Sequence, residues 1–179
     1  MGYRRLTTGH DDGRSVVKSD SELKSIVLLA APGVEFYHIW ASKEQPQIFA
    51  DGRIDVSGPY SPAPGGVRVA RVVFPPNTTA APDVEVSAEA AFADAEAKLP
   101  GMMQHLEPDH PGMHTSETVD VGIVESGEVW LELDDGRDFC LRAGDSFVQN
   151  GTRHAWHNRS SEPSVVTFVI MGADRVSHK

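Results

Sequence analysis

Cysteine, cationic side chains and long apolar runs are all scarce in this sequence of 179 residues. The single cysteine, Cys140, excludes a disulfide within the chain and fits a reducing compartment. Lys and Arg number 16 against 26 Asp and Glu, and the net charge of -10 disfavours nucleic acid and anionic membranes as partners. No apolar run reaches about eighteen residues, and the start MGYRRLTTGHDDGR lacks the apolar core of a secretory signal. We therefore predict a cytoplasmic protein.

Short strands separated by turns are the main expectation for the part of the chain before residue 110. A length of 179 residues with 40% apolar residues predicts one domain with a real core. We expect an N-terminal arm over 1–23 and a single domain over 24–179. Residues 24–41 predict two strands around a Pro32-Gly33 turn, and residues 66–74 predict another strand that ends at Pro75. One helix is expected over 87–99, with Ser87 as its N-cap.

The half of the chain over 110–172 carries turn signals at regular intervals. They are Asp134-Asp135-Gly136, Ala143-Gly144-Asp145, Asn150-Gly151 and the segment 160–163. These turns cut the segment into strands of about five to eight residues, which is typical of an all-β barrel or sandwich. Within this half, the stretch MHTSETVD places His114, Ser116, Thr118 and Asp120 at alternate positions. An extended chain would turn these four side chains to one face, as a metal site or as a polar pocket.

Two spaced motifs in this half resemble those of the cupin superfamily. The first cupin motif runs His-x-His, three or four residues, Glu, six residues, Gly, and here His114, Ser116, Asp120 and Gly127 occupy its positions. The second motif ends in Gly, two residues, His, three residues, Asn; this sequence has Gly151, His154 and Asn158 there, after Gly144-Asp145. The resemblance implies a cupin-type β-barrel, that is, a double-stranded β-helix or jelly roll. It would carry extra N-terminal strands and one helix, and cupin strands of that kind suggest a homodimer.

The sequence departs from the cupin pattern at three of these positions. Ser116 replaces the second histidine of the first motif, Asp120 replaces its glutamate, and Gln149 stands where the second motif often has proline. The resemblance therefore implies a shell of three metal ligands, His114, Asp120 and His154. Two imidazoles and one carboxylate can hold a divalent transition metal such as iron, zinc or manganese. A straight strand would hold His114 and Asp120 about 20 Å apart, so this site requires a bend near Glu117 or Thr118.

A metal-free polar pocket is the competing interpretation of the same residues. In it His114, Asp120 and Ser116 would hydrogen-bond to one another and to water. His110 is a further candidate ligand, whereas His105 and His157 are expected at the surface or behind the ligands. Trp156 and Asn158 share the parity of His154. We expect Trp156 either to fill part of the core or to form a pocket wall. We expect Asn158 either to hydrogen-bond to backbone groups or to orient a metal ligand.

Three functions are compatible with this pattern. In the first, a metal-dependent lyase or isomerase, such as a dehydratase or decarboxylase, acts on a small molecule, with His114 and His154 as catalytic residues. Ser116, Thr118, Trp156 and Asn158 would bind its substrate. The second is an iron(II) dioxygenase that uses the same ligands, and the third is a non-catalytic cupin that binds a ligand without metal. The remaining expectations are that Cys140 is a small core residue, that Arg153 and Glu117 are solvated, and that the helix is either a lid or a brace.

Overall fold

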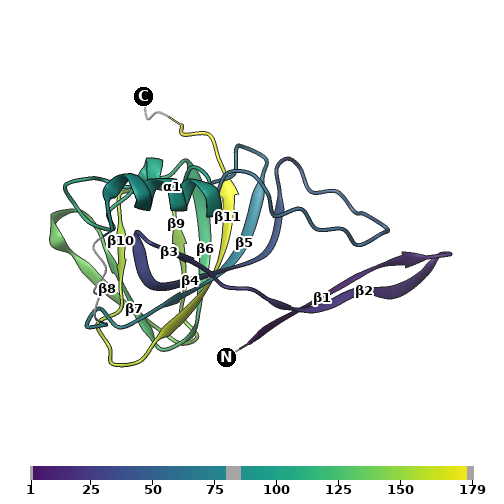
Figure 1. Cartoon of the computed structure of the whole chain (residues 1–179), viewed down its shortest axis with the longest axis horizontal. Helices are drawn as coiled ribbons and strands as arrows, with labels where there is room; N and C mark the ends of the chain where they lie inside the picture. Colours follow the sequence, from purple (N-terminus) through teal and green to yellow (C-terminus); the bar gives the residue numbers. More distant parts are fainter. Residues whose placement is uncertain (1, 80–85, 177–179) are drawn as a thin grey trace.

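Two antiparallel sheets form the barrel in the computed structural model, which describes residues 2–79 and 86–176 (Figure 1). The larger sheet has the order β3 (Ile26–Leu28), β4 (Ala31–Ser42), β5 (Val67–Phe74), β11 (Ser164–Gly172), β6 (Thr118–Ser126) and β9 (Ser146–Gln149). The smaller sheet has the order β10 (Ala155–His157), β7 (Glu128–Glu132) and β8 (Asp138–Arg142). The predicted all-β jelly-roll barrel with extra N-terminal strands and one helix is confirmed.

The barrel interior follows from strict alternation in the central strands. In β11 the side chains of Val166, Phe168 and Ile170 are buried while their neighbours are only partly covered. Strand β5 pairs with β11 along its whole length and alternates in the same way. Because side chains two apart share a face of a strand, these residues build one apolar wall. The core between the two sheets is completed by Val124 of β6 and Val129 of β7.

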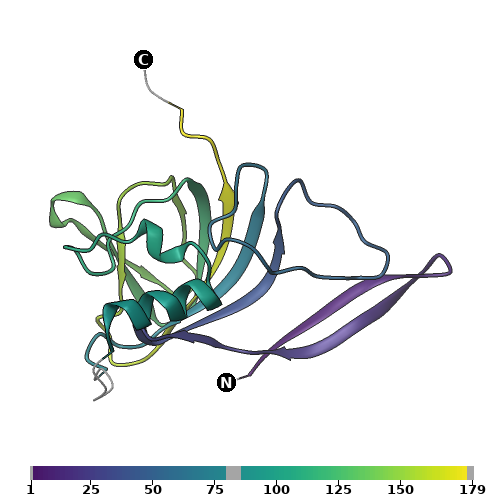
Figure 2. The ribbon, with the colours of Figure 1, turned by 45° about the horizontal axis from the view of Figure 1, so that its top comes forward.

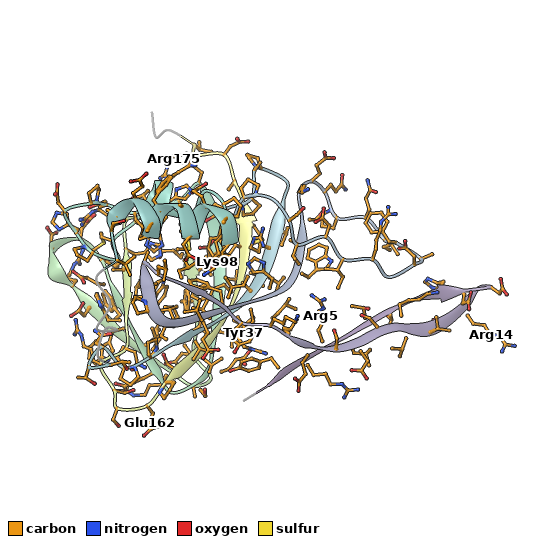
Figure 3. The ribbon with its side chains drawn as sticks, in the orientation of Figure 1. Arg5, Arg14, Tyr37, Lys98, Glu162 and Arg175 are labelled. Atoms are coloured by element: carbon orange, nitrogen blue, oxygen red, sulfur yellow. The ribbon has the colours of Figure 1, made fainter. Side chains whose placement is uncertain are left out.

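The N-terminal arm is a two-stranded hairpin that projects away from the barrel. It consists of β1 (Tyr3–Asp11) and β2 (Arg14–Leu23), which pair only with each other (Figures 1 and 2). At its base, Arg5 donates hydrogen bonds to the carbonyl oxygens of His38 and Ile39, beside Tyr37 (Figure 3). Nearer its tip, the backbone N–H of His10 donates to Ala50 of the long loop between β4 and β5. The hairpin and this loop therefore support each other outside the barrel.

One predicted turn is in the wrong place. The chain reverses between β3 and β4 at residues 29 and 30, so Pro32 and Gly33 lie inside the start of β4. Gly33 has a φ of 80°, and the pairing register of β3 with β4 shifts between Val27 and Leu28. A proline followed by a residue of positive φ is typical of a turn, but irregular strand edges also accept this pair. The Pro-Gly pair therefore marks an irregularity of the strand, and its interpretation as a reversal is wrong.

The predicted helix is confirmed as α1 (Ala88–Lys98). The Ser87 hydroxyl accepts a hydrogen bond from the N–H of Ala90, as expected of an N-cap. Lys98 donates to the carbonyl oxygen of Val27 in β3, and Ala95 and Leu99 are buried in the core cluster. Two short 3₁₀ helices follow in the chain. The first, η1 (Met102–His105), comes soon after α1, and the second, η2 (Asp134–Gly136), lies between β7 and β8. In the described part of the chain, no helix has the length and apolar character needed to cross a membrane.

An aromatic cluster closes the core beside Gly122 of β6. Phe147, Trp156 and Phe168 pack together, with ring centroids 4.7 Å apart for Phe147 and Trp156. A Cβ at Gly122 would lie 2.0 Å from the ring of Phe147. The absence of a side chain at Gly122 thus lets Phe147 lie across β6.

We expect Gly122→Ala to lower the free energy of unfolding by about 1–3 kcal/mol, because the Phe147 ring must leave its place. Chemical denaturation measures this loss. Its control is the same substitution in a Phe147→Ala background, where the added methyl group meets no ring and costs far less. An equal cost in both backgrounds would show that the ring is not the cause.

Candidate functional site

A cavity of about 230 Å³ lies inside the barrel between the two sheets. Most of its lining residues are apolar or aromatic, and a smaller number are polar. The lining residues include Val34, Phe36, Tyr60, Val72, Phe74, Met102, His105, Leu106, His114, Ser116, Thr118, Asp120, His154, Trp156, Phe168 and Ile170. Such a cavity, mainly apolar with a few polar groups together, is typical of a site that binds a small molecule.

His114 and His154 face each other across an isolated antiparallel bridge. Each backbone N–H donates to the carbonyl oxygen of the other residue, at 2.9 Å in both directions. Residues that are directly opposite in such a pair turn their side chains to the same face. The centroids of the two rings are consequently 4.1 Å apart.

Both rings have hydrogen-bond partners at Nδ1. His114 Nδ1 lies 2.9 Å from the carbonyl oxygen of Gly112, and His154 Nδ1 lies 2.8 Å from that of Thr152. A carbonyl oxygen can only accept, so His114 Nδ1–H donates to Gly112 and the lone pair of this ring stays on Nε2. His154 Nδ1 also lies 2.7 Å from Gln149 Nε2, whose N–H groups face the carbonyl and hydroxyl oxygens of Thr152 as well.

Burial keeps both imidazoles neutral at neutral pH. Desolvation lowers the pKa of His154 to about 4, with a smaller contribution from neighbouring His114. Desolvation also lowers the pKa of His114, against the opposing effect of its hydrogen bond to Gly112. A neutral imidazole with Nδ1–H held by a carbonyl is the form that binds a metal or accepts a proton through Nε2.

Asp120 brings a buried carboxylate to the same cavity from β6. Burial raises its pKa to about 6, and a hydrogen bond from Thr118 opposes this rise only in part. Thr118 is in turn 2.8 Å from the hydroxyl of Ser116, and both side chains are buried. Oδ1 of Asp120 is buried and has no hydrogen-bond partner within the described residues. An orphaned carboxylate oxygen in a cavity wall is a point where a ligand can bind.

Because of the raised pKa, the contribution of Asp120 to the free energy of unfolding depends on pH. The folded protein keeps the proton up to about pH 6, whereas the unfolded chain releases it near the ordinary value of 3.8. The stabilisation that the folded protein gains by holding this proton is therefore complete below pH 3.8 and is lost as the pH rises through 6.

We expect Asp120→Asn, which cannot ionise, to gain stability over the wild type by up to about 3 kcal/mol between pH 4 and pH 8. Urea denaturation across this range, with EDTA present, measures the difference. Asp109→Asn is the matched control because Asp109 is exposed. A constant difference between the Asp120 variant and the wild type at every pH would contradict the buried ionisation.

The alternating stretch of the sequence is placed as predicted. His114, Ser116, Thr118 and Asp120 all line the cavity, and the chain bends at Glu117 before β6 begins. Trp156 forms part of the wall, with its ring 5.7 Å from that of His154. The placement of these residues agrees with the prediction, while their roles in binding or catalysis stay predictions.

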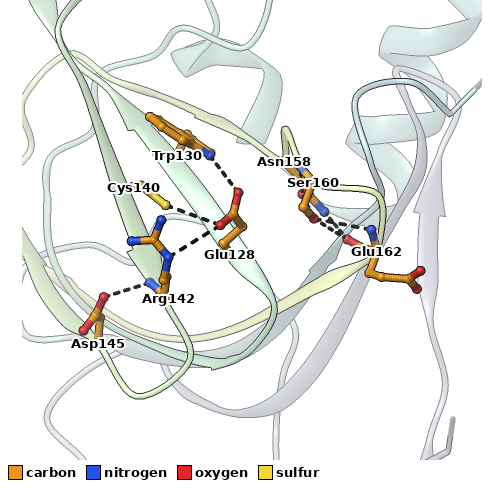
Figure 4. A network of polar contacts seen from close by, with 8 residues as sticks. All are labelled: Glu128, Trp130, Cys140, Arg142, Asp145, Asn158, Ser160 and Glu162. Atoms are coloured by element: carbon orange, nitrogen blue, oxygen red, sulfur yellow. Dashed lines mark hydrogen bonds and ion pairs between the residues drawn. The ribbon is translucent and has the colours of Figure 1, made fainter.

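Asn158 does not line this cavity. Its buried side chain donates to the carbonyl oxygens of Phe74 and Glu162 and accepts from Ser160 (Figure 4). All the hydrogen-bonding capacity of the amide is thus used in holding the loop after β10. This agrees with the expectation that Asn158 satisfies backbone groups. It does not agree with the expectation that Asn158 contacts a substrate in the cavity.

Cys140 also differs from its expected place. It is partly exposed on β8, and its thiol lies 3.7 Å from the Glu128 carboxylate, which also meets Arg142 and Trp130 (Figure 4). Cys140 therefore belongs to a polar network on the smaller sheet and not to the core. Arg153, expected to be solvated, instead forms ion pairs with Glu107 and Asp134.

Two lining residues were missed or misplaced by the sequence interpretation. His105 lines the cavity, and its Nδ1 lies 3.0 Å from the carbonyl oxygen of Thr115, which leaves its Nε2 available as in His114. Tyr60 reaches the cavity from the long loop between β4 and β5. Arg68, which is buried, donates to the carbonyl oxygens of Val56, Pro59 and Tyr60 and so holds this loop. His110, considered as a ligand, is exposed.

The predicted three-ligand metal shell fits the structure in part. The rings of His114 and His154 lie side by side, with centroids 4.1 Å apart and each Nδ1 beside a carbonyl oxygen, and Asp120 has an unpartnered oxygen. Over residues 2–79 and 86–176, however, no group of three or more His, Cys, Asp or Glu side chains is arranged to hold an ion. Asp120 therefore shares the cavity with the imidazoles without joining them in a cluster.

Fold and cavity together define a β-barrel that encloses a small-molecule pocket. Residues 102–170 match the Cupin_2 family, described as "Cupin domain". This match identifies residues 102–170 as a cupin domain of the cupin 2 type, which agrees with the barrel. The first motif of that domain contributes His114 and Asp120, and the second contributes His154.

Curated relatives match short parts of the chain. Phomopsin biosynthesis cluster protein C' of Diaporthe leptostromiformis is 50% identical over 48 residues, which are 27% of this chain and 25% of that protein. The cupin-domain-containing oxidoreductase virC of Hypocrea virens is 46% identical over 46 residues, 26% of this chain and 24% of that protein. The chain thus spans about a quarter of the length of these relatives. A solved structure described as a predicted oxalate decarboxylase from Thermotoga maritima is 17% identical, covers 83% of this chain and 92% of its own, and has a TM-score of 0.46.

Proposed function

We propose that this cupin is an enzyme of the lyase or isomerase type that moves a proton on a small molecule bound in the cavity. The observation that carries the proposal is the buried, unpartnered Oδ1 of Asp120 in the wall of a largely apolar cavity. A carboxyl group whose pKa lies at about 6 can both take and return a proton near neutral pH.

The neighbouring groups assign a role to each part of the polar wall. Ionised Asp120 takes a proton from a carbon next to a carbonyl group; the C–H electron pair forms a C=C bond, and the carbonyl π pair moves to the oxygen of the resulting enolate. The protonated carboxyl then returns the proton, to the same or to a neighbouring carbon. Thr118 and Ser116 hold the carboxylate through their linked hydroxyls. Nε2 of His114 or of His154 accepts a hydrogen bond from a hydroxyl group of the substrate.

Exchange of carbon-bound hydrogen in heavy water tests this function without knowledge of the natural substrate. The intact protein is incubated with a panel of uncharged aryl ketones and diketones, and deuterium incorporation is followed by mass spectrometry. We expect incorporation well above the buffer rate for at least one member of the panel. Incorporation at the buffer rate throughout would contradict proton transfer as the function.

Metal binding by His114, Asp120 and His154 is the alternative proposal for the same residues, in which Asp120 is a ligand and not the base. A divalent ion held there would act as a Lewis acid on a substrate oxygen. Elemental analysis of protein purified without added metal is the test, and we expect near-stoichiometric iron, zinc or manganese that is lost in His154→Ala. Metal retained in that variant would remove His154 from the shell, and retention in Asp120→Asn would leave the imidazoles as ligands without the carboxylate.

Oxidoreductase chemistry is the second candidate, and the names of two relatives favour it. VirC and srdD, the latter 34% identical over 67 residues, are both named cupin-domain-containing oxidoreductases. The corresponding proposal for this chain is an iron(II) dioxygenase. Oxygen uptake with catechols and diketones, after loading with iron(II), distinguishes it from proton transfer. Binding of small molecules with neither activity would identify the third possibility, a non-catalytic cupin.

We also propose a homodimer. The outer face of the larger sheet exposes Ile123 and Val148 at 50% and 60%, and the hairpin exposes Leu6 and Val17 at 48% and 56%. These apolar side chains lie on two surfaces that a second copy would cover. Light scattering coupled to size-exclusion chromatography is the test, and a monomer at micromolar concentration would refute the dimer.

A further inference from the structure

Tyr60 is held in the cavity wall by contacts from three separate segments of the chain. Its backbone N–H donates to the carbonyl oxygen of Pro100, just after α1, at 2.8 Å. Its carbonyl oxygen accepts a hydrogen bond from buried Arg68 of β5 at 3.0 Å. Its ring packs edge-on against the ring of Phe36 in β4, with centroids 5.9 Å apart. The position of the Tyr60 ring in the wall is therefore fixed by the fold around it.

The phenol of Tyr60 is a hydrogen-bond donor that the protein does not use. Over residues 2–79 and 86–176, its hydroxyl has no hydrogen-bond partner, although both backbone groups of the residue have one. A phenol is protonated at neutral pH, and burial raises the pKa of the Tyr60 phenol above its ordinary value of about 10. A donor without a partner in a cavity wall is a point where an acceptor of a ligand can bind.

The polar groups nearest to the two motifs are mostly engaged or are acceptors. Thr118 donates to Asp120, so the hydroxyl of Ser116, 2.8 Å from that of Thr118, donates to Thr118 in turn. In His105 and His114, Nδ1 lies beside a carbonyl oxygen at 3.0 and 2.9 Å, and Nε2 is left as an acceptor. An oxygen of a ligand with only lone pairs to offer therefore needs a donor from elsewhere in the wall.

Two other lining residues, Ser61 and Trp156, also carry side-chain donors. Tyr60 is favoured over them because its phenol is close enough to the Asp120 carboxyl group to interact with it electrostatically. A ligand that contacts Asp120 can thus reach the phenol at the same time. The Trp156 ring is held in the aromatic cluster with Phe147 and Phe168.

We propose that the Tyr60 hydroxyl donates a hydrogen bond to the carbonyl oxygen of the substrate and so selects carbonyl compounds for this cavity. The inference rests on the proposed function only in taking a carbonyl compound as the substrate. During proton transfer, the same hydrogen bond strengthens as negative charge moves onto the enolate oxygen. A bound ion does not replace this role, because Tyr60 is not one of the proposed metal ligands and a carbonyl oxygen has two lone pairs.

Two uncharged probes of the same shape isolate this hydrogen bond. Acetophenone has a carbonyl oxygen where α-methylstyrene has a methylene group. Since a cavity of about 150 Å³ accommodates benzene, the volume of about 230 Å³ in this barrel can hold one substituted ring. Calorimetric titration of the full chain, as purified, measures both affinities in the wild type and in Tyr60→Phe. We expect the substitution to weaken acetophenone binding about three- to tenfold, the range of one neutral hydrogen bond, and to leave α-methylstyrene binding unchanged.

The carbonyl stretching band of bound acetophenone gives a readout that a merely structural role of Tyr60 would not move. A hydrogen bond lowers the frequency of this band, so isotope-edited infrared spectra should show it at higher frequency in Tyr60→Phe than in the wild type. Tyr37→Phe is the matched control, because the Tyr37 hydroxyl donates to Glu35 and Tyr37 does not line the cavity. It should keep the wild-type affinity and frequency. All proteins are compared at equal metal content, checked by elemental analysis.

Each outcome decides the proposal. An unchanged acetophenone affinity and an unmoved band in Tyr60→Phe overturn it and assign the donor to Ser61 or Trp156. An equal loss of affinity for both probes also overturns it, because it would show that Tyr60 acts only through packing. So does the absence of acetophenone binding by the wild type. Failure of the proposed enzyme function is distinguishable, because acetophenone would then bind through Tyr60 while no ketone exchanges its hydrogen in heavy water.

Discussion

Asp120→Asn should lower the rate of hydrogen exchange on the best ketone of the panel by about 10²–10⁴-fold, the range typical of a lost general base. The substitution keeps the size and the hydrogen bond from Thr118 but removes the group that can hold the proton. Because the amide has no charge to desolvate, the variant should fold at least as well as the wild type above pH 6. Deuterium incorporation and thermal unfolding, measured on the same samples, separate loss of chemistry from loss of fold.

The pH dependence of the exchange rate is the control, because a purely structural role of Asp120 would not produce it. In the wild type the rate should rise through the pKa of Asp120, at about 6, and then level off. In Asp109→Asn the profile should be the same as in the wild type. A well-folded Asp120→Asn protein that keeps more than about a tenth of the wild-type rate would assign the base to another group, with His105 the first alternative in the wall.

Arg68→Met should lower the free energy of unfolding by about 3 kcal/mol, one of the largest effects of any single change in this chain. Arg68 is 2% exposed and donates to several carbonyl oxygens of the segment 56–60. Without these donors the segment loses its attachment to β5, and Tyr60 is no longer held at the cavity. Urea denaturation measures the loss of stability.

Arg71→Met is the matched control in the same strand. Its guanidinium lies on the opposite face of β5, partly exposed and paired with Glu125. Surface ion pairs contribute about 0–1 kcal/mol, so this variant should lose at most that amount of stability. Similar losses in both variants would show that the loop over 56–60 is not held by Arg68.

The polar wall of the site could be predicted largely from local spacing. Alternation in an extended chain is enough to put Ser116, Thr118 and Asp120 on one face, and the length of a straight strand required the bend that brings His114 to them. The position of His154 opposite His114 followed only from the resemblance to cupins. Sequence spacing says nothing of which strands are neighbours, because that depends on contacts between residues far apart in the chain.

Other parts of the site had no local signal. His105 was expected at the surface or behind the ligands, and it reaches the cavity only because 105–107 pairs with the segment before β6. Tyr60 lies in a proline-rich loop whose path depends on a buried arginine eight residues away. Asn158 lies at the right motif position, but its amide is used by backbone from two distant segments.

The sequence was enough to predict the class of the fold, the helix with its cap, and the polar residues of the two motifs. These depend on turn chemistry, side-chain periodicity and motif spacing, all of which act over a few neighbouring residues. The packing of distant segments settled that two imidazoles meet across a bridge, that His105 and Tyr60 join them at the cavity, and that no Lys or Arg lines the described part of its wall. Such distances and exclusions arise where strands from distant parts of the chain are packed against each other, and the energy of that packing is not encoded in any single segment.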